Sequence, residues 1–169
     1  MPTSFTWNEN TLTQHVDLSN PNISFPVVAD PAWTYSYKFP TGSKNSQQAR
    51  ALLKKCFNCY FPVTGAPKAF PTAGQKLPLK VGVLNFECTF DKEVYNSLHM
   101  WIGFKFKATK NHIDQLGSYV NFTFQPVGGA NHLLISAYVV NISFVVNNAF
   151  YRSGAIQKWT EFANKIKNG

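Results

Sequence analysis

Residues 98–109 read LHMWIGFKFKAT, and apolar side chains largely alternate with polar ones along this stretch. A period of two places every second side chain on the same face of a β-strand. We therefore predict a strand with one apolar face toward a core and one face toward solvent. The predicted inward side chains are Leu98, Met100, Ile102, Phe104 and Phe106. The predicted outward side chains are His99, Trp101, Lys105 and Lys107.

The stretches on either side of this strand extend the pattern into an antiparallel meander. Residues 79–90 and 119–126 alternate in the same way, and residues 127–131 (VGGAN) are typical of a turn. Residues 132–146 are apolar on both faces over much of their length, which favours a central strand covered on both sides. The meander therefore has about four long strands.

Two segments have the apolar spacing of an amphipathic helix. In the first, apolar residues recur at helical intervals from Ala49 to Tyr60, Ser43 or Ser46 is placed to cap the start, and Pro62 ends it. The second runs over residues 153–167, near the end of the chain. Each apolar stripe needs a sheet face to cover, so the sequence predicts an α+β fold. A jelly-roll β-sandwich with the first helix inserted is the alternative.

The amino-terminal part differs from the rest. Residues 1–22 are polar and aperiodic, which favours an extended N-terminal arm. Residues 23–29 and 33–39 are typical of two short strands. With 169 residues in the chain, we expect a single α+β domain over residues 23–169.

The charge is distributed unevenly. The net charge is +8, and residues 31–86 contain basic residues but neither Asp nor Glu. An unopposed positive segment favours nucleic acid, RNA above all, or an anionic membrane surface as its partner. Trp101, Lys105 and Lys107 suggest a second surface, on which bases stack. The basic residues of the segment are Lys38, Lys44, Arg50, Lys54, Lys55, Lys68, Lys76 and Lys80.

The cysteines and the candidate acid–base residues form no recognised catalytic motif. Cys56 and Cys59 make a single C-x-x-C, and Cys88 is the third cysteine. An odd number of cysteines favours unpaired thiols in a reducing compartment. A tetrahedral zinc site would need a fourth ligand, which the sequence pattern does not supply. We therefore predict no enzyme, no cofactor, no metal and no small-molecule substrate. The enzymatic alternative is a site built from Glu87, His99 and Cys88.

The low proportion of charged residues bears on self-association. Only 14% of the residues are charged while 44% are hydrophobic, which favours self-association. The sequence shows no signal peptide and no apolar run long enough to span a bilayer, so we expect a cytoplasmic or virion protein. The functional hypothesis is a self-associating structural protein of the viral coat or matrix type, with segment 31–86 as its binding surface. The alternative is a monomeric or dimeric single-stranded RNA-binding regulator that uses the Trp101 face.

Overall fold

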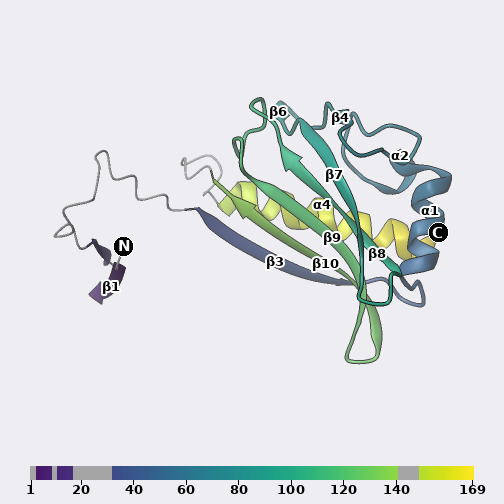
Figure 1. Ribbon diagram of the computed structural model, residues 1–169, viewed down its shortest axis with the longest axis horizontal. Coiled ribbons are helices and arrows are strands. Elements are labelled where there is room, and N and C mark those ends of the chain that lie inside the picture. The colour runs from purple at the N-terminus through teal and green to yellow at the C-terminus, as the bar shows by residue number, and fades with distance from the viewer. Residues whose placement is uncertain (1–2, 9–10, 17–31, 141–148) are drawn as a thin grey trace. The chain divides into compact units, whose positions relative to one another are not determined.

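A computed structural model describes residues 3–8, 11–16, 32–140 and 149–169 (Figure 1). The chain divides into two units, Met1–Asp30 and Pro31–Gly169. In the first unit, β1 (Thr3–Asn8) and β2 (Thr11–Val16) pair as an antiparallel hairpin where the sequence predicts an extended arm. The predicted domain boundary after residue 22 and the predicted strand 23–29 lie outside the described residues.

The second unit is built on an antiparallel sheet, which has six strands in the described part of the chain. Four consecutive strands form the predicted meander. At one edge β3 (Trp33–Pro40) pairs with β10 (Ala130–Val139), and at the other the short β4 (Lys76–Leu77) pairs with β7 (Cys88–Tyr95). A small separate hairpin joins β5 (Lys80–Val81) to β6 (Leu84–Asn85). In spatial order the sheet strands are β3 (Trp33–Pro40), β10 (Ala130–Val139), β9 (Tyr119–Val127), β8 (Trp101–Ala108), β7 (Cys88–Tyr95) and β4 (Lys76–Leu77).

The first predicted helix is two helices in the structure, α1 (Ser46–Lys55) and α2 (Phe57–Tyr60). Its cap is Asn45 rather than Ser43 or Ser46, because the Asn45 side chain accepts from the Gln48 backbone N–H in a capping box. The break occurs at Cys56, which is extended. The Phe57 N–H donates a hydrogen bond of 2.7 Å to the carbonyl of Lys68, so it does not continue the hydrogen-bond pattern of α1.

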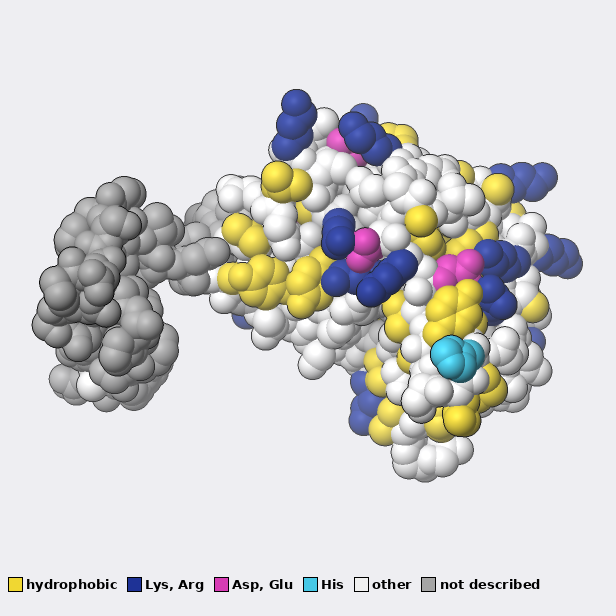
Figure 2. Space-filling view, in the orientation of Figure 1, with side chains coloured by type: hydrophobic (Ala, Val, Ile, Leu, Met, Phe, Trp, Pro, Cys, Tyr) yellow, Lys and Arg dark blue, Asp and Glu magenta, His cyan; other side chains and the backbone are white. Residues whose placement is uncertain are grey.

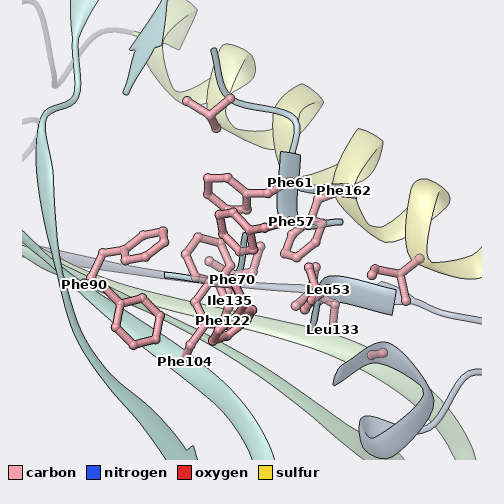
Figure 3. Packing of buried hydrophobic residues seen from close by; sticks show 14 of the residues in the cluster. Leu53, Phe57, Phe61, Phe70, Phe90, Phe104, Phe122, Leu133, Ile135 and Phe162 are labelled. Atoms are coloured by element: carbon pink, nitrogen blue, oxygen red, sulfur yellow. The ribbon is translucent and has the colours of Figure 1, made fainter. Parts of the chain in front are cut away.

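The long carboxy-terminal helix, α4 (Ala149–Asn168), runs along one face of the sheet. Helices α1 and α2 lie near the carboxy-terminal end of α4 (Figure 1). One main sheet covered by helices is the predicted α+β architecture, which is therefore confirmed, and it excludes the jelly roll. The covered face is rich in phenylalanine. Phe61, Phe104, Phe122 and Phe162 pack between α4 and the strands (Figure 3), with the Phe104 and Phe122 ring centroids 5.1 Å apart.

The predicted inward and outward faces of β8 are correct for the residues after Gly103 and reversed for the residues before it. Leu98, predicted inward, lies in the turn before β8 and is 74% exposed. Within β8, Phe104 and Phe106 are buried as predicted, whereas Trp101, predicted outward, is only 1% exposed. The cause is a β-bulge: Val94 and Tyr95 on β7 oppose Gly103 and Trp101 on β8, so one extra β8 residue intervenes. A single inserted residue moves every side chain before it to the other face.

The strand predicted to be covered on both sides, β10, is buried on one face only. Leu133, Ile135, Ala137 and Val139 are buried, while Ser136 between them is exposed. In the sheet, β10 is flanked by β3 and β9, but α4 covers only one side of it. In the described part of the chain β10 therefore has no second covering layer, and Leu134 and Tyr138 on its other face are only half-buried.

Candidate ligand-binding cavity

A cavity of about 80 Å³ lies between α4 and the covered face of the sheet. The central strands form one wall through residues such as Phe106 and Phe122, and α4 forms the other through Ala155 and Trp159. The β5–β6 hairpin and the segment after α2 contribute further apolar side chains. A mostly apolar space enclosed between a helix and a curved sheet suits a small apolar molecule.

Polar residues gather at one part of the cavity lining. Tyr35 of β3, Cys88 of β7, and His112, Asp114 and Ser118 of the β8–β9 loop all line it. The loop is held in place by its own hydrogen bonds: the Asp114 backbone N–H donates to His112 Nδ1 at 2.9 Å, and the Ser118 hydroxyl donates to the Asp114 carbonyl. The loop is anchored to the end of β10 because the Val140 N–H donates to Ser118 Oγ at 2.9 Å.

Burial keeps three of these groups uncharged near neutral pH. It lowers the pKa of His112 to about 4, so the imidazole is neutral. Burial, followed by the negative charge of Asp114, raises the pKa of the Cys88 thiol to about 12. The same two causes raise the pKa of Tyr35 far above its ordinary range. Asp114 therefore supplies the negative charge that acts on its neutral neighbours.

Trp159 brings a further donor to this cluster from α4. Its indole nitrogen is buried and makes no hydrogen bond of good geometry with the described residues. It nevertheless lies close enough to Tyr35 to act on the phenol, lowering its pKa against the larger effect of burial. Buried donors without acceptors are uncommon in folded proteins, and each costs about 1–3 kcal/mol. The Tyr35 hydroxyl is therefore the acceptor nearest to the Trp159 N–H.

The basic segment does not remain unopposed in the folded protein. Glu93 of β7 binds both Arg50 and Lys54 of α1, each at 2.9 Å. Lys54 also lies over the Phe70 ring, 4.2 Å from its centroid. The acid that compensates these charges comes from outside residues 31–86, so sequence proximity does not reveal it.

The other predicted binding residues are distributed over several elements. Lys38 is on the edge strand β3, Lys76 and Lys80 are on β4 and β5, and Lys44, Lys55 and Lys68 lie in or beside the α1–α2 region. Figure 2 shows Lys and Arg side chains spread across the visible face with acids among them, rather than in one patch. A continuous cationic surface therefore does not form on this face.

The predicted Trp101 surface is also absent, because the bulge turns Trp101 inward. Its ring packs on Phe124 with centroids 5.8 Å apart. Lys105 lies 3.8 Å from the Tyr119 ring centroid, and Lys107 binds Asp91 at 2.8 Å. Aromatic stacking of bases needs exposed rings. Trp101, the ring on which that hypothesis depended, is in the core.

The residues of the enzymatic alternative do not meet. Cys88 begins β7 and lines the cavity, whereas His99 is exposed in the turn that follows the other end of β7. Glu87 accepts a hydrogen bond from Thr109 Oγ1 at 2.6 Å, which is the main cause of its lowered pKa. Acid–base chemistry requires converging groups, and these three residues do not converge.

The cysteines are arranged differently from the sequence prediction of unpaired thiols. Cys56 and Cys59 are joined by a disulfide with their Cα atoms 5.3 Å apart, and Cys88 is a buried free thiol. The described residues contain no group of three or more His, Cys, Asp or Glu placed to hold a metal ion. Among the helices of the described ranges, none has the length and apolar character needed to cross a bilayer.

The cavity and its polar cluster were not predicted. Tyr35, His112, Asp114 and Trp159 come from one strand, a loop and the last helix, so no local spacing relates them. The one available signal is the pairing of a His and an Asp in the short loop between two strong strands. Loops carried by a rigid sheet often supply binding residues.

No protein-family model matches the chain, and no curated protein matches its sequence. Solved structures do resemble its fold. Ginseng major latex-like protein 151 from Panax ginseng has a TM-score of 0.56 and 10% identity, covering 81% of this chain and 96% of its own. KanY protein has a TM-score of 0.52 and 11% identity over 83% and 97%. A Bacillus halodurans protein has a TM-score of 0.50 and 11% identity over 80% and 96%.

These resemblances correct the functional hypotheses. The prediction of a viral coat or matrix protein is wrong, and so is that of an RNA-binding regulator, because the fold is of another kind and Trp101, the ring on which the second hypothesis depended, is in the core. The partner prediction, which excluded a small molecule, is wrong because it missed the apolar cavity. The chain has an α+β fold resembling the Bet v1/START-like folds.

Proposed function

We propose that the protein binds a small, mostly apolar molecule in the cavity beneath α4. The observation that carries the proposal is the cavity itself, which combines an apolar lining with buried polar groups at one part. Such a combination gives affinity through apolar burial and orientation through a few hydrogen bonds. At about 80 Å³ the cavity is smaller than the roughly 150 Å³ apolar cavity that holds one benzene ring, so in the described conformation it admits only a ligand of a few heavy atoms.

We further propose that the bound molecule is not chemically converted. The two groups of the lining best suited to catalysis are held inactive near neutral pH: the Cys88 thiol has its pKa raised to about 12 and His112 has its pKa lowered to about 4. A nucleophilic thiol and a general base both need a pKa close to the working pH. A cytoplasmic location stays a prediction from the sequence.

Filling the cavity from α4 is expected to weaken ligand binding at least about tenfold. Ala155 lines the cavity, and Ala155→Leu adds three carbons to that space. Xenon, dissolved at increasing pressure in a solution of the full chain and followed by two-dimensional NMR, is expected to bind the unchanged protein saturably and to shift the signals of cavity residues. The variant is expected to bind at least about tenfold more weakly, because the added side chain occupies the apolar volume.

Ala51→Leu is the matched control, since Ala51 is exposed on α1 and away from the cavity lining. It adds the same side chain to a helix and is expected to leave xenon binding unchanged. Equal affinity of the Ala155→Leu variant and the unchanged protein would contradict the proposed site. A xenon response confined to residues outside the cavity lining would contradict it as well.

A further inference from the structure

The two members of the Cys56–Cys59 disulfide differ in exposure. Cys59 is exposed in α2, whereas Cys56 is half-buried at the break between α1 and α2. A disulfide opens when a thiolate attacks one of its two sulfur atoms, so the rate depends on which sulfur a thiolate can reach. Cys59 is therefore the member open to attack, and Cys56 is the member that leaves.

The bend between α1 and α2 is held by contacts other than the disulfide. The Phe57 N–H donates to the Lys68 carbonyl at 2.7 Å, and the Phe57 side chain is fully buried. The Asn58 N–H donates to the Pro67 carbonyl at 3.1 Å. The disulfide joins residues only three apart in sequence, and short loops constrain the unfolded chain least. We therefore expect the fold to persist when the bond is open, as repeated exchange requires.

Cys59 also lines an open groove of about 840 Å³ between α2 and the carboxy-terminal part of α4. The groove is rich in amide and hydroxyl side chains. Amide side chains both donate and accept hydrogen bonds, as a peptide backbone does. The groove therefore offers a peptide chain hydrogen-bonding partners next to the disulfide. These polar lining residues are Tyr60 of α2 and Gln157, Thr160, Asn164 and Asn168 of α4.

The two charged side chains of the described groove lining pair with each other. Lys165 lies 3.5 Å from Glu161, which also binds Lys158 at 2.9 Å. Opposite charges at this separation largely cancel at a distance. The groove is therefore polar and close to neutral, which matches a peptide backbone better than a phosphate or another strongly charged group.

We infer that the Cys56–Cys59 pair undergoes thiol–disulfide exchange with a peptide dithiol held in this groove. One peptide thiolate bonds to Cys59 Sγ, the bond between the protein sulfurs breaks, and Cys56 Sγ leaves with the electron pair and takes up a proton. The second peptide thiolate then attacks the peptide sulfur bonded to Cys59, and Cys59 Sγ leaves and is protonated in turn. The peptide dithiol becomes a disulfide, and its two electrons reduce the protein disulfide to two thiols.

This inference goes beyond the proposed ligand binding, because no described residue lines both the groove and the cavity beneath α4. A failure of exchange therefore leaves the proposed function standing, and a failure of xenon binding leaves the exchange standing.

The unchanged protein provides the first test. Dithiothreitol is expected to open the Cys56–Cys59 bond while the NMR spectrum stays that of the folded chain. Alkylation with iodoacetamide, followed by mass spectrometry, is expected to label Cys56 and Cys59 and to leave Cys88 unlabelled, because Cys88 is a buried thiol. A bond that opens only in denaturant would overturn the inference.

Cys56→Ser and Cys59→Ser form a matched pair, since each leaves one member of the disulfide as a free thiol. Each variant is mixed with glutathione disulfide, a peptide disulfide. The free protein thiolate bonds to one glutathione sulfur, and the other glutathione leaves as its thiolate. Cys56→Ser, which keeps the exposed Cys59, is expected to form the glutathione adduct at least about tenfold faster than Cys59→Ser. Equal rates would overturn the assignment of Cys59 as the reacting member.

Asn164→Leu in the Cys56→Ser background tests the groove, because leucine is similar in size to asparagine and lacks the amide. The rate with glutathione disulfide is divided by the rate with hydroxyethyl disulfide, which has no peptide groups. This ratio is expected to fall about fivefold, the effect of one lost hydrogen bond. Because both rates are measured on the same protein, a change in the reactivity of Cys59 itself cancels. An unchanged ratio would overturn the groove as the peptide site.

Discussion

Replacing Gly103 with alanine is expected to destabilise the protein by about 4 kcal/mol or more, enough to unfold a marginally stable domain. Gly103 follows the bulge of β8, where β9 approaches closely. A Cβ atom at this position would overlap the Phe122 carbonyl oxygen and lie 2.8 Å from Thr123 Cα. Both are backbone atoms of a central strand, so they cannot move aside without breaking the pairing of β8 with β9.

Gly154→Ala is the matched control for this substitution. Gly154 lies in α4, and a Cβ atom there would have nothing within 4 Å. Because glycine is unfavourable inside a helix, this variant is expected to gain up to about 1 kcal/mol. Chemical denaturation of both variants measures the difference. Similar stability of Gly103→Ala and the unchanged protein would mean that β8 and β9 do not approach as described.

Acidification from about pH 7 to about pH 4.5 is expected to lower the free energy of unfolding by about 2.5 kcal/mol through His112 alone. The folded protein holds this imidazole neutral with a pKa of about 4, below its ordinary value of 6.5. Between these values the unfolded chain binds a proton that the folded protein does not. The contribution is therefore complete above about pH 6.5 and decreases as the pH falls toward 4.

Denaturant unfolding at several pH values measures this slope, and the window ends near pH 4.5 because carboxylates begin to bind protons there. His112→Asn is expected to remove most of the slope. His99→Asn is the control, because His99 is exposed in the β7–β8 turn and has a positive φ of 56°, which asparagine tolerates. If the His112 variant and the unchanged protein have the same slope, His112 is not buried as a neutral group.

The strands and the last helix were predictable because their signals are local. Phe104, Phe106, Phe122 and Phe124 alternate along their strands, and all four are buried on the covered face. The stripe containing Phe162 likewise predicted a helix that covers the sheet. Period and polarity within a few residues suffice for such elements, because the geometry of a strand or helix repeats over the same distance.

The local sequence pattern did not predict side-chain direction or charge pairing where a single inserted residue, or a partner distant in the sequence, determined it. The alternation around Trp101 is nearly regular, yet the bulge beside Gly103 reverses its direction. The charges of Arg50 and Lys54 looked unopposed because Glu93 is far away in sequence, on another element. In both cases the deciding contact is between strands or between a helix and a strand.

The sequence alone determined the amphipathic elements and their α+β class, because a hydrophobic period of 2 or 3.6 residues is a property of the local chain. Only the tertiary structure decided where the charges pair, which way Trp101 points, and that Tyr35, His112, Asp114 and Trp159 surround one cavity. These are relations between residues that folding brings together across the sheet and α4. Their energies depend on the distances between the residues and on their burial, and both are set only when the chain folds.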